Sequence, residues 1–114
     1  MTDRVQLVRD CYRAYETGDR ALLERVIADG YTFSAPPDPW LDREGYFARC
    51  WPGHGQFAGF TFRRLVEVGD EVLATYEATR HDGTRFRNTE IFSFDGDRIG
   101  RTEVYFGWEL PRAA

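Results

Sequence analysis

Apolar residues recur every three to four positions in the first part of the chain. Residues 3–16 show this period, which predicts an amphipathic helix. The Gly18-Asp19 pair that follows suits the end of one helix and the start of another, because glycine adopts the left-handed conformation and aspartate caps helix starts. We therefore expect a second, shorter helix that ends near Gly30.

The segment between this helix and residue 57 mixes extended and helical signals. Alternation predicts a short strand at residues 31–35. Residues 36–40, PPDPW, are expected to form an irregular loop, because proline can join neither a helix nor a strand ladder. Asp42 can cap a third helix, which Pro52 and Gly53 end.

From residue 57 onward the pattern changes to alternation with a period of two. Short turns join the alternating segments, and two of these turns contain Asp-Gly, which favours hairpins. The predicted strands are residues 57–68, 71–80, 84–94 and 98–109. Three helices followed by an antiparallel meander predict an α+β fold, with the helices packed on the concave face of a curved sheet above a pocket. We expect one domain over residues 1–114.

Composition narrows the range of partners. The chain has nine Phe, six Tyr and three Trp in 114 residues, enough to line a cavity. Its 15 basic residues are scattered and its net charge is −4, which argues against nucleic acid as a partner. No apolar run approaches the ~20 residues of a membrane span, and no signal peptide is visible. Two cysteines without a CxxC motif suit a reducing compartment, so we expect a cytoplasmic protein.

The order of these elements resembles the NTF2-like superfamily and, within it, the SnoaL-like proteins. The matching motifs are YRAYETGDRALLERVIADGYTF (12–33), LDREGYFARCWP (41–52), FRNTEIFSFDGDRI (86–99) and EVYFG (103–107). The resemblance implies a cone-shaped scaffold, a homodimer and a pocket for a small apolar organic ligand. It leaves the reaction open, because this superfamily includes steroid isomerases, polyketide cyclases, dehydratases, epoxide hydrolases and members without known catalysis.

Steroid isomerases of this superfamily use three groups, and the resemblance matches one of them here. Their general base precedes a proline at the end of the first strand, where this chain has Ala35. Their tyrosine donor falls on Cys11, and their carboxylic acid falls on Glu90. The resemblance therefore argues against a steroid isomerase of the familiar kind.

Alternation assigns the side chains of each long strand to one of two faces, provided that no bulge interrupts the strand. The more apolar set should line the pocket. This set comprises Phe60, Phe62, Arg64, Val66, Ala74, Tyr76, Ala78, Phe86, Asn88, Glu90, Phe92, Phe94, Val104, Phe106 and Trp108. Tyr15 and Trp40 are further aromatic candidates for the pocket wall. The opposite face, which includes Thr75, Thr89 and Tyr105, is the expected dimer interface.

Glu90 is the main candidate for chemistry, because a carboxylate among rings must be paired or take up a proton. Two interpretations are open. Arg64, Asn88 or Tyr76 holds Glu90 as a structural buried acid, or its pKa is raised and it acts as a general acid or base. His54, between two glycines, is a second catalytic candidate because histidine titrates near neutral pH.

The sequence thus predicts a small-molecule-binding domain. If it is an enzyme, we expect a cofactor-independent isomerase, cyclase or dehydratase that acts on an apolar carbonyl compound by proton transfer. The alternative is a non-catalytic ligand-binding or dimerisation module. The two histidines have no metal-ligand spacing and no phosphate-binding loop is present, so no metal or cofactor is expected.

Overall fold

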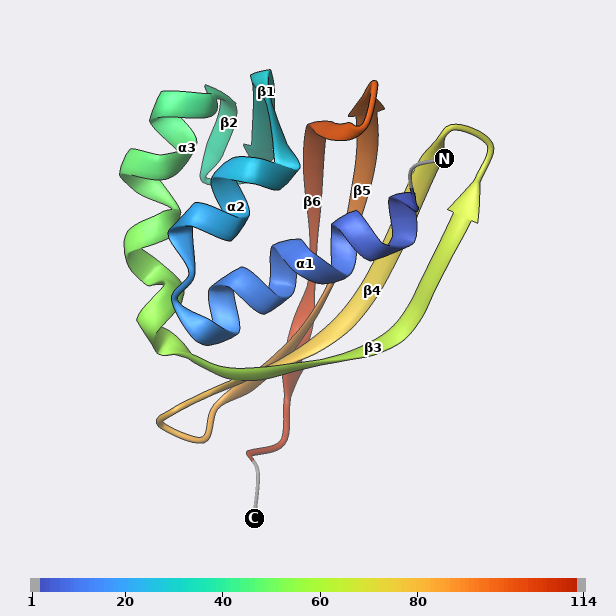
Figure 1. Cartoon of the computed structure of the whole chain (residues 1–114). Helices are drawn as coiled ribbons and strands as arrows, with labels where there is room; N and C mark the ends of the chain where they lie inside the picture. The colour runs from blue at the N-terminus through green and yellow to red at the C-terminus, as the bar shows by residue number, and fades with distance from the viewer. Residues whose placement is uncertain (1–2, 113–114) are drawn as a thin grey trace.

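The computed structural model describes residues 3–112, which form three α-helices, one 3₁₀ helix and a curved six-stranded sheet (Figure 1). The elements are α1 (Arg4–Thr17), α2 (Arg20–Val26), β1 (Ile27–Ala35), β2 (Asp38–Asp42), α3 (Arg43–Arg49), η1 (Trp51–Gln56), β3 (Phe57–Val68), β4 (Glu71–Arg80), β5 (Arg85–Asp95) and β6 (Arg98–Leu110). The strand order is β2-β1-β6-β5-β4-β3. The predicted α+β class and terminal meander are confirmed, but β1 runs parallel to β6, so the sheet is mixed rather than wholly antiparallel.

An aspartate caps the start of each α-helix, and two of these caps, Asp19 and Asp42, were predicted from the sequence. The side chains of Asp3, Asp19 and Asp42 each accept a backbone N–H at the start of α1, α2 and α3. Gly18 ends α1 in the left-handed conformation, with φ 69°. Helix α1 crosses the concave face of the sheet (Figure 1), where it contacts β3, β4 and β6.

The segment between α2 and α3 differs from the prediction. β1 begins at Ile27 rather than at residue 31, so α2 is shorter than expected. Residues 36–40 are not an irregular loop throughout, because β2 occupies part of them and pairs antiparallel with β1. The strand tolerates Pro39 because β2 is an edge strand, where a missing N–H on the outer side breaks no ladder hydrogen bond.

An aromatic core lies between α1 and the even-numbered face of β4 and β5. The ring of Tyr12 meets the rings of Phe62, Tyr76 and Phe92 edge-on, with centroid distances of 4.9, 4.9 and 6.1 Å. Edge-to-face pairs of this kind each add about 0.5–1.5 kcal/mol beyond the area they bury. The largest fully buried side chains are Tyr31, Phe92, Leu23, Ile27, Ile99, Val8, Val72 and Thr102.

A bulge in β3 reverses the predicted alternation. Phe62 pairs with Tyr76, whereas Arg64 pairs with the next residue of β4, Thr75, so β3 holds one extra residue at this point. Beyond the bulge Leu65, not Arg64, packs against the core, and Arg64 is exposed. Residues 62–64 contain neither Gly nor Pro, so the sequence gave no signal for this bulge.

A second bulge interrupts β6. Phe106 pairs with Asn88 and Glu109 pairs with Phe86, so three steps along β6 match two along β5. Gly107 sits in this bulge, where an added Cβ would overlap the carbonyl oxygen of Arg87. Glycine is therefore required by the close approach of two backbones.

We expect Gly107→Ala to destabilise the fold by about 1–3 kcal/mol, because the new methyl group must displace the β5 backbone. Urea unfolding followed by circular dichroism measures the loss. Gly30→Ala is the matched control, since an added Cβ there meets nothing within 4 Å. Equal stabilities for the two variants would show that the two strands are not in close contact at Gly107.

Candidate active site

A cavity of about 580 Å³ lies between α1, α3, η1 and the sheet. Aromatic side chains form much of its wall, among them Tyr12, Tyr15, Phe33, Phe57, Phe60 and Phe86. The volume lies within the range of sites that enclose small organic molecules. An apolar ligand of modest size therefore fits the cavity.

The carboxylate of Glu90 lies in the wall of this cavity at the end of a chain of hydrogen bonds. Tyr76 Oη donates to Glu90 Oε2 at 2.6 Å. Asn88 Nδ2 donates to Tyr76 Oη at a long 3.5 Å, and the backbone N–H of Gly107 donates to Asn88 Oδ1 at 3.1 Å. Each group in this series donates toward the carboxylate. The backbone N–H of Gly107, in the β6 bulge, therefore sets the orientation of the Asn88 amide, which in turn orients the Tyr76 hydroxyl.

Strand register brings these side chains together. Tyr76 on β4 pairs directly with Asn88 on β5, and Glu90 pairs with Ala74 on one side and Val104 on the other. Tyr76 and Glu90 are thus diagonal neighbours on one face, within reach of a long side chain. Both cross-strand neighbours of Glu90 are apolar and supply no countercharge.

Burial raises the pKa of Glu90 to about 7 from an ordinary value of 4.5. The hydrogen bond from Tyr76 opposes this rise, because it stabilises the ionised form. The hydroxyl of Tyr12 also lies near the carboxylate and opposes the rise, although its geometry falls short of a hydrogen bond. Glu90 therefore exchanges a proton near neutral pH, as a general acid or base does.

Tyr12 is the cavity tyrosine with a spare hydroxyl. Tyr15 bonds to Tyr46 at 2.6 Å, and Tyr31 donates to Thr102 at 2.7 Å. The hydroxyl of Tyr12 is buried and makes no hydrogen bond within the part of the chain that the structure describes. A buried hydroxyl without a partner costs about 1–3 kcal/mol, which a ligand oxygen would recover.

Burial, followed by the nearby Glu90 carboxylate, raises the pKa of Tyr12 well above its ordinary value. Its hydroxyl therefore stays protonated and can donate a hydrogen bond. Tyr12 is not among the candidates predicted from the sequence, and neither are Tyr31 and Tyr46, which also line the cavity. Helical spacing shows that Tyr12 faces inward, but it cannot show which hydroxyl lacks a partner.

Several candidates from the sequence meet at the cavity. They are Tyr15, Tyr76, Asn88, Glu90, Val104 and Phe106. Phe106 lies at the mouth, where it is 59% exposed. The even-numbered face of β4 and β5, which alternation assigned to the cavity, therefore does line it. Most of the candidates that lie elsewhere belong to other helices and strands.

The bulges affect two further candidates. Arg64 is exposed and does not line the cavity, so it cannot pair with Glu90 as one interpretation required. This assignment was wrong because one inserted residue exchanges the two faces of a strand. Trp108 borders the cavity as expected, but it is 62% exposed and its ring lies 5.5 Å from the guanidinium of Arg87, on the opposite face of the sheet.

Three further candidates lie outside the cavity wall. Trp40 is 77% exposed on the edge strand β2, where its φ of 61° turns it away from the regular strand. His54 stacks on Trp51 in η1, with ring centroids 4.4 Å apart, and it does not line the cavity. Phe92 faces inward as expected, but it is fully buried in the core against Tyr12 and does not reach the cavity.

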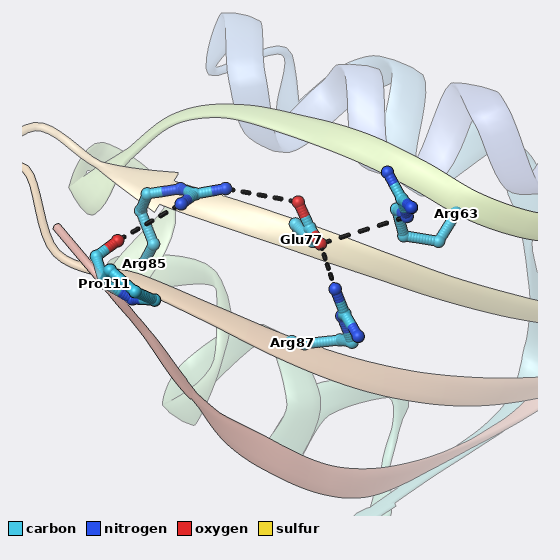
Figure 2. Close-up of polar contacts among 5 residues, drawn as sticks. All are labelled: Arg63, Glu77, Arg85, Arg87 and Pro111. Atoms are coloured by element: carbon cyan, nitrogen blue, oxygen red, sulfur yellow. Dashed lines mark hydrogen bonds and ion pairs between the residues drawn. The ribbon is translucent and has the colours of Figure 1, made fainter. Parts of the chain in front are cut away.

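The opposite, convex face of the sheet holds an ion cluster around Glu77 (Figure 2). The Glu77 carboxylate contacts Arg63 at 4.0 Å, Arg85 at 3.2 Å and Arg87, and the hydrogen bond from Arg87 is the main cause of its lowered pKa. Arg85 also donates to the carbonyl oxygen of Pro111 at 3.1 Å. Three guanidinium groups around one carboxylate leave this patch positively charged.

A family model described as a SnoaL-like domain matches residues 8–102. An NTF2-like protein of unknown function from Cytophaga hutchinsonii has a TM-score of 0.74 at 17% identity, with 94% of this chain and 92% of that chain covered. A provisionally named polyketide cyclase from Sinorhizobium meliloti has a TM-score of 0.73 at 17% identity, with 87% and 93% covered. A provisionally named ketosteroid isomerase from Kribbella flavida has a TM-score of 0.72 at 14% identity, with 95% and 82% covered.

These matches confirm the resemblance to NTF2-like and SnoaL-like proteins. At such low identities the structural similarities show the fold alone. A comparison with curated proteins found no match. Between residues 3 and 112, no helix is long and apolar enough to cross a membrane.

The raised pKa of Glu90 predicts a specific dependence of stability on pH. The folded state holds the Glu90 proton more tightly than the unfolded chain, so this contribution to stability is fully present below pH 4.5 and is lost as the pH rises through about 7. Glu90→Gln removes the dependence. Relative to wild type, the variant should gain on the order of 3 kcal/mol in free energy of unfolding across this interval.

Urea unfolding of both proteins at about pH 4 to 9 measures this difference, and all other titrating groups cancel in the comparison. A difference that stays constant across the range would contradict a raised pKa for Glu90.

Proposed function

We propose the following function for this chain, which belongs to the SnoaL-like domain family: its cavity binds a small, largely apolar carbonyl compound, and Glu90 transfers a proton on it without a cofactor. The observation that carries the proposal is the pairing of two groups in one apolar wall. Glu90 has a pKa of about 7, and the Tyr12 hydroxyl beside it has no partner among the described residues.

The two groups suggest a division of roles. Tyr12 donates a hydrogen bond to the carbonyl oxygen of the ligand, which stabilises negative charge as it develops on that oxygen. Ionised Glu90 removes a proton from the carbon next to the carbonyl and returns it at another position. Tyr76 holds the carboxylate in place during both steps. A pKa near the working pH favours each direction of transfer.

This sequence of steps fits isomerisation, aldol-type cyclisation and dehydration, which all begin with removal of such a proton. The names of two structural relatives, a polyketide cyclase and a ketosteroid isomerase, support this range of reactions. The cavity wall does not distinguish between these three reactions, because the polar groups beside Glu90 would serve each of them equally well.

A second candidate function is a binding module without catalysis. Ala35 lines the cavity at the position where the resemblance to steroid isomerases would put a general base. Glu90 would then be a structural acid held by Tyr76. This alternative predicts that ligands bind and dissociate chemically unchanged.

We further propose that the convex face of the sheet pairs with the same face of a second copy. Tyr105, 53% exposed, lies near the centre of this face, beside the hydrogen-bonded pair Thr75 and Thr89. The positive cluster around Glu77 lies on one side of this centre, and Glu103, which Arg101 contacts at 3.7 Å, lies on the other. A twofold axis near Thr89 would bring each cluster to Glu103 of the second copy, as an isologous interface requires.

Deuterium exchange tests the catalytic proposal without knowledge of the substrate. The protein is incubated in D₂O with a panel of small cyclic and aryl ketones, and NMR follows loss of the hydrogens next to the carbonyl. Wild type should exchange at least one ketone that it binds. Glu90→Gln should lower the exchange rate by about 10²–10⁴-fold, and Tyr12→Phe by about 10²-fold or more.

Two controls separate catalysis from folding. Tyr12→Phe breaks no protein hydrogen bond and removes a buried hydroxyl without a partner, so the variant should be at least as stable as wild type. Arg64→Gln, on the other face, should leave exchange unchanged. Binding of a ketone without exchange by wild type would favour the binding module instead.

Sedimentation tests the proposed dimer. Wild type should sediment as a dimer at micromolar concentration, and Tyr105→Glu should give a monomer because it buries an unpaired charge at the centre of the interface. Arg13→Glu, at an exposed residue of α1 on the other side of the sheet, is the control. A wild-type chain that stays monomeric up to about a hundred micromolar contradicts the proposal.

A further inference from the structure

Arg80 supplies a cation at the end of the cavity away from Glu90. We infer that the ligand is an elongated apolar acid, with its carbonyl group near Glu90 and an anionic group, such as a carboxylate, bound by Arg80. The inference rests on the proposed function, because both groups belong to the same cavity. The proposed reaction does not identify the ligand, and the inference adds the chemical class of that ligand.

The guanidinium of Arg80 is held in position and is largely free to donate. It lies over the ring of Phe86, with Cζ 4.5 Å from the ring centroid, and Nη1 donates to Thr84 Oγ1 at 3.2 Å. A guanidinium has five N–H donors in a planar fork that matches a carboxylate. The contact with the Phe86 ring holds the guanidinium at the cavity wall. The Arg80 side chain therefore loses little conformational freedom when it binds an anion.

The charges around Arg80 leave it without a carboxylate partner. Within residues 3–112 it makes no ion pair, whereas Arg49, the other arginine that lines the cavity, contacts Asp38 at 2.6 Å. Asp82 lies in the same turn, where hydrogen bonds from Thr84, with a smaller contribution from the charge of Arg80, lower the pKa of its carboxyl, but the two side chains form no ion pair.

One more acid lies on this side of the cavity. Glu109 also lines the wall, where it is exposed and makes no ion pair with Arg80. Solvent screens an exposed carboxylate, so Glu109 neutralises Arg80 only weakly. A partly buried arginine with a spare planar fork in an apolar cavity therefore favours an anionic ligand group.

Strand geometry sets the distance between the two ends of the ligand. Glu90 pairs with Ala74, six residues before Arg80 on β4, so the register positions of the two groups lie about 20 Å apart along the sheet. Their polar ends come closer than this, because Tyr76 holds the Glu90 carboxylate and the Arg80 guanidinium lies over Phe86, which pairs with Ala78. Phe57, which pairs with Arg80, and Phe60, which pairs with Ala78, line the wall between the two ends. The ligand that fits is an apolar body on the order of 10 Å long with an acidic group at its far end.

A matched pair of fluorescent probes tests the inference. Anilinonaphthalene sulfonate and phenylnaphthylamine share an anilinonaphthalene ring system, and only the first carries an anionic sulfonate. Fluorescence titration gives the Kd of each probe for wild type, Arg80→Gln, Arg80→Lys and Arg64→Gln. Arg64→Gln is the control for net charge, because it removes one positive charge on the opposite face. Near-UV circular dichroism establishes that each variant is folded.

Arg80→Gln should weaken binding of the sulfonate probe by about tenfold or more and leave the Kd of the neutral probe within about twofold. Arg80→Lys, which keeps the charge without the planar fork, should give an intermediate Kd for the sulfonate probe, and Arg64→Gln should change neither probe. If Arg80→Gln fails to fold, the comparison of Arg80→Lys with wild type decides alone.

Equal losses for both probes, or no loss for either, would overturn the anion subsite while leaving the cavity as a binding site. Failure of wild type to bind the neutral probe would instead contradict the proposed function, and the inference with it.

Discussion

The hydrogen bond from Tyr76 to Glu90 is the interaction on which the arrangement of the site depends. A carboxylate in an apolar wall must be paired, hydrogen-bonded or protonated, and this one has a single short hydrogen bond and no cation. The bond fixes the position of the acid without neutralising it, which leaves its pKa near neutrality. Asn88 and Gly107 extend the same chain to β6, so the orientation of Glu90 depends on backbone geometry two strands away.

The bulges in β3 and β6 separate two charged environments that simple alternation would mix. With its bulge, β3 exposes Arg64 and packs Leu65 against the core, so no arginine of this strand reaches Glu90. In β6, the ring of Trp108 instead lies over Arg87, beside the ion cluster around Glu77. The cavity face therefore leaves Glu90 without a nearby cation, while Arg63, Arg64, Arg85 and Arg87 lie on the convex face.

Helix caps and alternation are local signals, and they were sufficient for most of the fold. Asp19, Asp42 and Gly18 mark helix ends because their own side chains or conformations do so. The bulge in β3 has no local signal, and the glycine at position 107 does not reveal that the carbonyl oxygen of Arg87 on another strand requires it. Glu90 could be identified as the main acid because the alternation within its own strand places it among aromatic residues. The unpartnered hydroxyl of Tyr12 could not, because it depends on contacts between α1 and the sheet.

The most direct test of the central claim is an NMR titration of the Glu90 carboxyl carbon in ¹³C-glutamate-labelled protein, with Glu90→Gln used to assign the signal. The account predicts a midpoint near pH 7. It also predicts a higher midpoint in Tyr76→Phe, because that variant loses the hydrogen bond that stabilises the ionised form. A midpoint near the ordinary value of 4.5 in wild type, unchanged in Tyr76→Phe, would contradict the account.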